Sequence, residues 1–401
     1  MKNIVICADG TGNSFRRSVS NVARMIQFLN LDDHATQVGV YDQGIGTDAG
    51  RWKEIEDFRR TIADRDALLV LPGPIESWFK PIEWTALLCG LAFGCGLKDN
   101  VAQMYRTLAA LYDKGDTVFL FGFSRGAFTL RALAGLIYRC GLPPSAHADF
   151  RRRFERAWRL FEPMFPREAE TQRFWATHGQ RECPIHFLGV WDTVKSYGGF
   201  RPTMLPHLRH NPIVAHVRHA LALDERRGWF DATTWGRLDI DRKPTAAWSR
   251  LSREVKTRIE AQDIEEVWFR GCHSDIGGGD EQQQTARIAL RWMLGEAAHL
   301  GLRLNNHGVD LLRPQAGHET AKVHESDTLG WRLIECIPRW TIDNSGDWPK
   351  RVSARTRQAV RHPHELRRDG HITVHESVDA LVGAPNVMAV GTKTVVAGRP
   401  E

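Results

Sequence analysis

The sequence lacks the long apolar run that a membrane-spanning helix requires: within its 401 residues, no stretch of about 18 apolar residues is uninterrupted. It also lacks a basic-then-apolar leader ahead of its first apolar segment, so no Sec-type export signal is expected. Internal repeats and low-complexity tracts are absent as well. We expect a globular chain that is cytoplasmic as synthesised and whose secretion, if any, is independent of such a signal.

Cysteine is scarce and scattered, which argues against a disulfide framework and a structural zinc site. The seven cysteines are an odd number, contain no CxxC pair and show no zinc-ligand spacing. We predict reduced, mostly buried thiols, and we expect neither a metal nor another cofactor.

A large excess of charge of one sign is also missing. The net charge is +6 with 25% charged residues, and the arginine clusters at 151–153 and 367–368 are short. Such clusters are typical of a solvated face, so we expect no nucleic-acid partner. An anionic lipid surface or substrate would suit the mild positive charge.

The chain does contain alternating strand-like and helical segments, and its 42% of hydrophobic residues suffices for a sizeable core. This alternation predicts an α/β fold with a mostly parallel sheet. Ligands bind beyond the carboxyl ends of the strands in such sheets, so we expect the active site there. The expected strands are 3–8, 37–41, 117–122, 185–190 and 266–269, and the expected helices include 19–29 and 100–112.

The segment 117–136, TVFLFGFSRGAFTLRALAGL, carries the most informative motif. An apolar strand leads through Gly122–Gly126 into a helix with apolar residues at helical spacing, which is the nucleophile elbow of α/β-hydrolases. The two glycines leave room for a sharp turn where a Cβ would clash with a neighbouring strand or helix. We predict Ser124 as the nucleophile and the backbone N–H of Arg125, at the helix N-terminus, as an oxyanion donor.

A serine nucleophile needs a general base and an acid that orients the base, and in this fold the chain order is serine, acid, histidine. Asp192 follows one strand-like run and is the predicted acid, whereas His273 follows another and is the predicted base. Three alternatives stay open. His219 or His375 could be the base, and Asp275 could be the acid, bind substrate or pin its loop.

The second oxyanion donor of this fold comes from a loop after an early strand. The sequence DGTGN at 9–13 follows the first expected strand, and we predict Thr11 and Gly12 as donors, with Asp9 in the same substrate loop. A plain β-turn is the alternative interpretation, because DG and GN are turn dipeptides.

Seven motifs occur in order between residues 3 and 280: DGTGN, YDQGIGT, FGCGL, GFSRGA, GVWDTV, HALALDERR and HSDIGGG. In these motifs the chain resembles an uncharacterised α/β-hydrolase domain family that includes type VI secretion phospholipase effectors. The resemblance implies a Ser-Asp-His esterase, carried here by Ser124, Asp192 and His273. For the effector members it also implies hydrolysis of membrane phospholipids, and hence a lipid or phospholipid ester as substrate.

We expect an α/β-hydrolase core over residues 1–345 and a C-terminal appendage over 346–401 that packs on it. The segment at about 50–98 breaks the alternation with a charged stretch and then an apolar, proline-punctuated one. A cap over the site is our first interpretation. A buried helical hairpin and a peripheral patch that dips into a lipid interface are the alternatives.

Three rival functions are less well supported. The glycine-rich loop at 44–50 suggests a nucleotide site, but a charged stretch follows it instead of an apolar helix. A metal-dependent hydrolase would use Asp9, His273 and Asp275 as ligands, although no histidine pair has helical spacing. The third is a catalytically inactive binding protein. We predict ester cleavage through an acyl-enzyme.

Overall fold

The computed structural model describes the greater part of the chain. The described residues are 1–10, 19–42, 68–71, 96–144, 149–164, 167–194, 197–198, 201–202, 205–235, 249–279, 284–313, 323–324, 326, 339–341, 350–352, 371–375 and 392–396.

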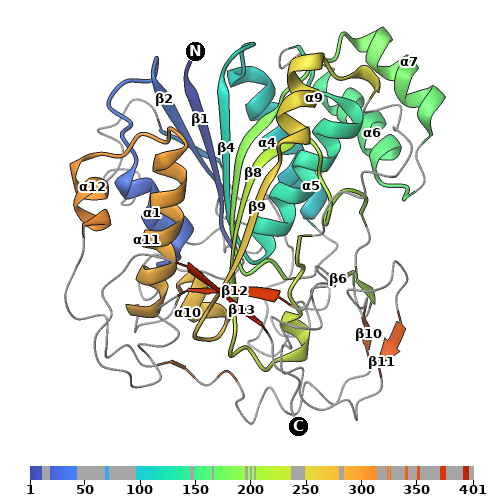
Figure 1. Ribbon diagram of the computed structural model, residues 1–401. Coiled ribbons are helices and arrows are strands. Elements are labelled where there is room, and N and C mark those ends of the chain that lie inside the picture. Colours follow the sequence, from blue (N-terminus) through green and yellow to red (C-terminus); the bar gives the residue numbers. More distant parts are fainter. Residues whose placement is uncertain are drawn as a thin grey trace, which may run out of the picture.

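The described residues build a nine-stranded central sheet in the order β13-β12-β9-β8-β5-β4-β1-β2-β3 (Figure 1). Neighbouring strands are parallel from β3 through to β12, whereas β13 runs antiparallel to β12. This mostly parallel sheet confirms the predicted α/β-hydrolase-like fold. The strands are β1 (Asn3–Ala8), β2 (Gln37–Asp42), β3 (Leu68–Leu71), β4 (Thr117–Phe123), β5 (Ile185–Trp191), β8 (Val214–Ala222), β9 (Asp263–Phe269), β12 (His371–His375) and β13 (Thr392–Val396).

Helices cover both faces of the sheet. Since successive side chains of a strand point to opposite faces, both sets of side chains are buried and apolar. In β1, Ile4 and Ile6 join one buried cluster, whereas Val5 and Cys7 join the cluster on the other side. β4 repeats the pattern, with Val118 and Leu120 on one face and its phenylalanines on the other. The near-continuous apolar runs seen in the sequence therefore mark the interior strands.

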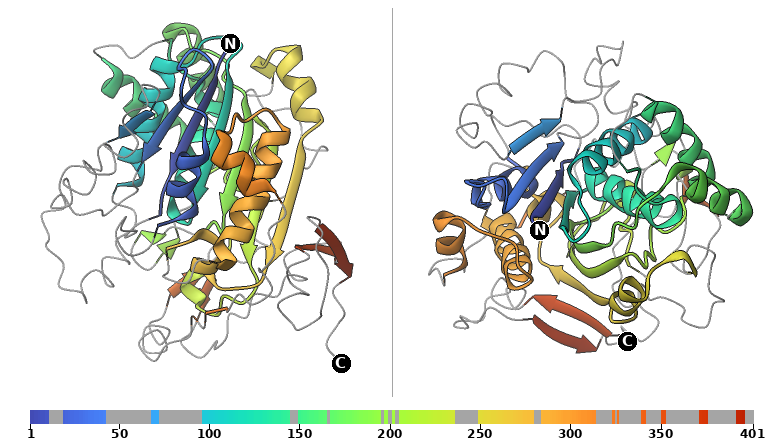
Figure 2. Two further views of the ribbon diagram at one scale, coloured as in Figure 1. Left: turned by 90° about the vertical axis from the view of Figure 1, so that its left-hand side faces the viewer. Right: turned by 90° about the horizontal axis from the view of Figure 1, so that it is seen from above.

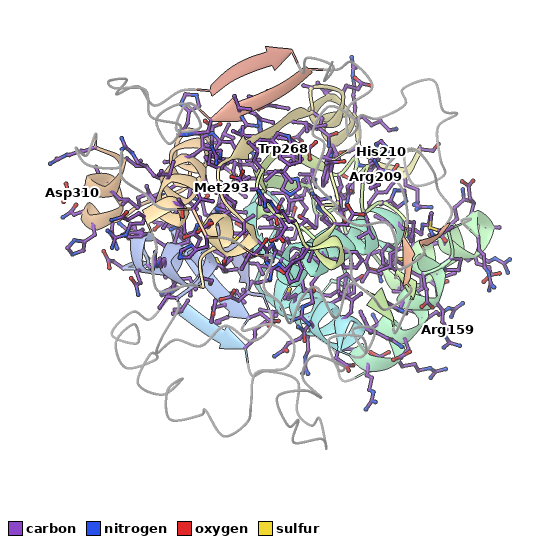
Figure 3. All side chains as sticks on the ribbon, turned by 90° about the horizontal axis from the view of Figure 1, so that it is seen from below. Arg159, Arg209, His210, Trp268, Met293 and Asp310 are labelled. Atoms are coloured by element: carbon purple, nitrogen blue, oxygen red, sulfur yellow. The ribbon has the colours of Figure 1, made fainter. Side chains whose placement is uncertain are left out.

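Helices cover the two faces as separate layers, which the view from above shows (Figure 2). From below, Arg159 of α6 and Asp310 of α12 lie at opposite margins (Figure 3). Met293 of α11 lies against the sheet, where a Cβ on Gly189 of β5 would meet its sulfur at 2.6 Å. The first layer holds α4 (Leu97–Leu111), α5 (Arg125–Cys140), α6 (Phe150–Phe161) and α7 (Glu168–His178), and the second holds α1 (Asn21–Phe28), α11 (Gln284–His299) and α12 (Asn306–Leu312).

Short elements complete the described chain. They are α9 (Arg253–Glu260), α10 (His273–Gly277), the 3₁₀ turn η2 (Gly228–Phe230), and the two antiparallel pairs β6 (Tyr197–Gly198) with β7 (Arg201–Pro202) and β10 (Arg339–Thr341) with β11 (Lys350–Val352). No helix among the described residues has the length and apolar character to traverse a bilayer.

The two edges of the sheet are formed by strands that lie outside the predicted alternation of strands and helices. β12 and β13 belong to the expected appendage at 346–401, and β12 pairs with β9 through Val374 and Trp268. At the opposite edge β3 pairs with β2, although it lies inside the segment 50–98 that we expected to form a cap. Of the remainder of that segment, residues 50–67 and 72–95 lie outside the described residues.

Candidate active site

Ser124 sits on the sharp turn between β4 and α5. Its backbone has φ 57° and ψ −116°, a positive-φ conformation that L-residues rarely adopt. Its N–H donates to the carbonyl of Trp191 at the end of β5, at 3.0 Å, which anchors the turn to the neighbouring strand. Ser124 as a whole residue is 7% exposed, so it lies at a nearly enclosed position above the sheet.

The flanking glycines make this turn possible because the backbone passes very close to its neighbours. A Cβ on Gly126 would lie 2.1 Å from the carbonyl oxygen of Ala8, and a Cβ on Gly122 would lie 2.8 Å from the backbone of Ala127. Neither contact is sterically allowed. The elbow thus lies against the carboxyl end of β1, close to Ala8 and Asp9.

Asp192 follows β5 directly and is fully buried. Its backbone has φ 39°, and its N–H donates to the carbonyl of Ala220 at 2.7 Å. One carboxylate oxygen, Oδ1, accepts the N–H of Ala222 at 3.0 Å. Neighbouring β8 therefore holds both the backbone and the carboxylate of Asp192, and leaves Oδ2 directed at a third group.

That third group is the imidazole of His273, the first residue of α10. Its Nδ1 lies 2.6 Å from Oδ2 of Asp192, and its Nε2 lies 2.8 Å from Oγ of Ser124. A carboxylate accepts only, so we assign the proton to Nδ1 and let Nε2 accept the serine hydroxyl. Burial lowers the pKa of His273, and the hydrogen bond to Asp192 acts in the opposite direction.

Aromatic rings hold the imidazole of His273 from two sides. The ring of Phe123 lies 4.6 Å away at an angle of 32°, and Phe230 meets it edge-on at 4.9 Å. Phe123 can take this place because Gly277 has no side chain: a Cβ there would lie 1.9 Å from the Phe123 ring. Phe123, the second residue of the elbow, thus packs between His273 and Gly277 at the end of α10.

Two residues that the sequence analysis did not single out, Glu225 and Arg227, lie beside His273. Oε2 of Glu225 accepts the His273 backbone N–H at 3.1 Å. The same carboxylate accepts from Nε and Nη2 of Arg227 at 2.9 and 2.7 Å. Both occur in LDERR, a charged run after β8 that resembles an exposed turn. The signal was available in the motif HALALDERR, but charge alone does not distinguish a solvated turn from a buried ion pair.

His219, one alternative base, lies in β8 and is fully buried. Its Nδ1 contacts Oε1 of Glu266 at 2.8 Å, and its Nε2 accepts the N–H of Thr193 at 3.2 Å. Burial lowers the pKa of His219, whereas the hydrogen bond that its imidazole donates to Glu266 acts in the opposite direction. The two ring nitrogens contact Thr193, the residue after Asp192, and Glu266 of the neighbouring strand β9, so this histidine supports the loop that carries Asp192.

The other two alternatives also have separate positions. His375 lies in β12 and stacks on Phe269 with ring centroids 4.6 Å apart, and burial lowers its pKa to about 4. The carboxylate of Asp275 accepts the N–H groups of Cys272 and His324, each at 3.0 Å. Asp275 thereby caps the first turn of α10, the helix that carries His273.

The loop after β1 begins with Asp9, which is buried. Its carboxylate accepts the Gly10 N–H at 2.7 Å and the hydroxyls of Ser20 and Tyr41 at 2.5 and 2.9 Å. The N–H of Gly10 is therefore occupied. Thr11 and Gly12, the predicted oxyanion donors, lie outside the described residues.

The remaining predicted oxyanion group, the Arg125 N–H, lies in the first turn of α5 directly after Ser124. Burial lowers the pKa of the Arg125 side chain to about 9. Within the described ranges, no three His, Cys, Asp or Glu side chains are arranged to hold a metal ion. Four cysteines there, Cys7, Cys140, Cys183 and Cys272, are buried and unbridged.

A mostly parallel sheet with a serine on its strand-to-helix elbow defines the α/β-hydrolase class. Within that class, the chain belongs to the family described as "T6SS, Phospholipase effector Tle1-like, catalytic domain", whose model matches residues 2–296. This confirms the resemblance found in the sequence motifs. Membership of a phospholipase family supports a lipid-hydrolase function for the chain.

The chain is also similar to an individual protein. The chain is 31% identical to the Uncharacterized protein YEL023C of Saccharomyces cerevisiae over 438 aligned residues, which cover 81% of this chain and 60% of that protein. It therefore spans less than two thirds of this curated relative.

Two solved structures are similar. One is an uncharacterized protein from Pseudomonas aeruginosa, 17% identical with a TM-score of 0.38, covering 79% of this chain and 51% of that one. The other is the Tle1 effector bound to the VgrG spike from the type 6 secretion system, 16% identical with a TM-score of 0.30, covering 70% and 51%.

Proposed function

We propose that the protein is a serine esterase that cleaves carboxylic esters of lipids, with phospholipids as the substrate class. One observation carries the proposal: a continuous hydrogen-bond chain runs from Ser124 through His273 to Asp192, with separations of 2.8 and 2.6 Å. The family supplies the lipid substrate, and the hydrogen-bond chain supplies the chemistry.

The reaction proceeds by acyl transfer. His273 takes the proton of Ser124 through Nε2 while the serine oxygen attacks the ester carbonyl carbon, and Asp192 stabilises the imidazolium that forms. The imidazolium then gives its proton to the departing alcohol, which leaves an acyl-serine. Water attacks that ester with His273 again as the base, and the fatty acid and free Ser124 are released.

The oxyanion would be held by two backbone N–H groups. Arg125 supplies the first, since it follows the nucleophile at the positive end of the helix dipole of α5. We propose the N–H groups of Thr11 and Gly12 for the second, since the Gly10 N–H already donates to the carboxylate of Asp9. One such donor is typically worth about 3 to 4 kcal/mol of the barrier.

The experiment compares wild type with Ser124→Ala on phosphatidylcholine and phosphatidylglycerol vesicles and on soluble fluorogenic esters, with fluorophosphonate labelling in parallel. We expect wild type to be labelled and to release fatty acid, and Ser124→Ala to do neither while keeping its fold. The control is Ser252→Ala, an exposed serine before α9, which should behave as wild type.

Three results would contradict the proposal in whole or in part. Substantial ester cleavage by folded Ser124→Ala would remove the serine from the chemistry. Loss of wild-type activity on addition of a chelator, without fluorophosphonate labelling, would favour the metal-dependent alternative. Cleavage of soluble esters alone would keep the mechanism and refute the lipid substrate.

A further inference from the structure

We propose that Glu225 and Arg227 form a charge-balanced pair that positions His273 and sets the pH range in which it acts as a base. The proposal rests on the proposed function, because it assigns a role around the proposed base. Both are positioning residues: neither is placed against the reacting atoms, and each acts through the histidine.

The first step concerns the place of Glu225. Its side chain is fully buried, and its Oε2 accepts the backbone N–H of His273, at 3.1 Å. That N–H belongs to the first residue of α10 and has no partner within its own helix. A carboxylate at this point fixes where the helix begins, and hence where the imidazole emerges. It also places a negative charge beside the ring that becomes positive during the reaction.

The second step concerns Arg227, which neutralises that carboxylate. Its Nε and Nη2 form a bidentate ion pair with the two carboxylate oxygens of Glu225, at 2.9 and 2.7 Å. Its side chain is 14% exposed. The guanidinium lies 3.8 Å over the ring of Phe230, and Phe230 in turn meets the imidazole of His273 edge-on. The arginine therefore supports His273 by two routes, one ionic and one aromatic.

The third step is the balance of charge at His273. Burial is the largest influence on the pKa of His273 and lowers it; against that background Asp192 and Glu225 raise the pKa, whereas Arg227 lowers it. Asp275 on the same helix is paired with His324. With the pair intact, the effects of Glu225 and Arg227 on the imidazole oppose each other.

The consequence is a pair of opposite shifts. Removing the charge of Glu225 takes a negative charge away from the imidazole, which disfavours the imidazolium and moves the acidic limb of activity to lower pH. Removing the charge of Arg227 takes a positive charge away, which favours the imidazolium and moves the limb to higher pH. A residue that only holds the fold would lower activity or stability without this opposition of sign.

The experiment measures the rate of fluorophosphonate labelling and kcat/KM on a soluble fluorogenic ester from pH 4 to 9. Glu225→Gln keeps an oxygen for the His273 N–H, and Arg227→Met keeps the length of the side chain. We expect the acidic limb to move by about half a pH unit or more in each, in the opposite directions given above, since a charge within about 4–6 Å shifts a pKa by about 1–3. The double variant should return near the wild-type position.

Arg227→Lys is the conservative control: it keeps the charge and loses the bidentate contact, so its limb should stay near that of wild type even if its rate falls. Circular dichroism and thermal melts establish folding. If Arg227→Met fails to fold, the downward shift in Glu225→Gln still decides the matter. Shifts in the same direction, or reduced rates with unmoved limbs, would overturn the proposal. Absence of labelling in wild type would instead refute the proposed function, and this inference with it.

Discussion

Replacing Asp192 by asparagine should abolish the proposed function of His273 as a general base while leaving the protein folded. In wild type, Oδ1 of Asp192 accepts the Ala222 N–H at 3.0 Å, and Oδ2 receives the proton on Nδ1 of His273 at 2.6 Å. Asparagine has one oxygen and one NH₂ group, so it can satisfy only one of these donors. If its oxygen stays on Ala222, the NH₂ faces Nδ1, the imidazole proton moves to Nε2, and Nε2 can no longer accept from Ser124.

The loss should be about 10⁴ in kcat, or roughly 5.5 kcal/mol of transition-state stabilisation, as a wrong tautomer costs in triad enzymes. The assay is kcat on a fluorogenic ester at pH 8, together with fluorophosphonate labelling. The control is Asp310→Asn on α12, whose side chain is 57% exposed at the margin of the molecule and which should keep full activity. A folded Asp192→Asn variant that loses less than about tenfold would refute the tautomer argument.

Two further predictions concern stability. Gly126→Ala places a Cβ 2.1 Å from the carbonyl oxygen of Ala8 and should cost about 1–3 kcal/mol or more in urea unfolding, whereas Gly295→Ala in α11, where the nearest atom is 3.8 Å away, should gain up to about 1 kcal/mol. Equal midpoints for Gly126→Ala and wild type would contradict the close approach at the elbow. Burial lowers the pKa of His375 to about 4, so the unfolded chain binds a proton that the native chain does not as the pH falls from about 6.5 to 4, and stability should fall over that range by up to about 1.4 kcal/mol per pH unit. His375→Phe should retain the ring stack on Phe269 and reduce this slope, and an unchanged slope would exclude the histidine as its source.

Local patterns were enough to predict the fold class and the elbow. The strands β1 and β4 are buried on both faces and read as apolar runs, and the glycines around Ser124 are required by contacts within one turn. β8 was missed because His216, Arg218 and His219 interrupt its apolar residues. These side chains are tolerated there because they have partners: Arg218, for example, binds Asp263 and Glu296.

The partners of Ser124 were harder to predict, since they depend on which strand ends meet. The contact between His273 and Ser124 joins residues 149 positions apart, and nothing local in a chain with 17 histidines fixes it. Asp192 and His273 were predicted because each follows an apolar strand. Residues after β8 occupy an equivalent position, but β8 itself was not predicted. Glu225 follows β8 and reaches His273, but its buried setting depends on Arg227, which sequence patterns alone do not link to it.

The strand β12, from the C-terminal part of the chain, covers the edge of β9. The family match ends at residue 296, yet the sheet continues beyond it, since Val374 and Trp268 share a buried cluster across the pairing of β12 with β9. A shortened chain that stops at 296 would expose the unpaired backbone N–H and C=O groups of β9 and the side chain of Trp268. Such an exposed strand edge favours edge-to-edge association between molecules. Fragments cut to the family boundary should therefore self-associate, whatever their catalytic residues can do.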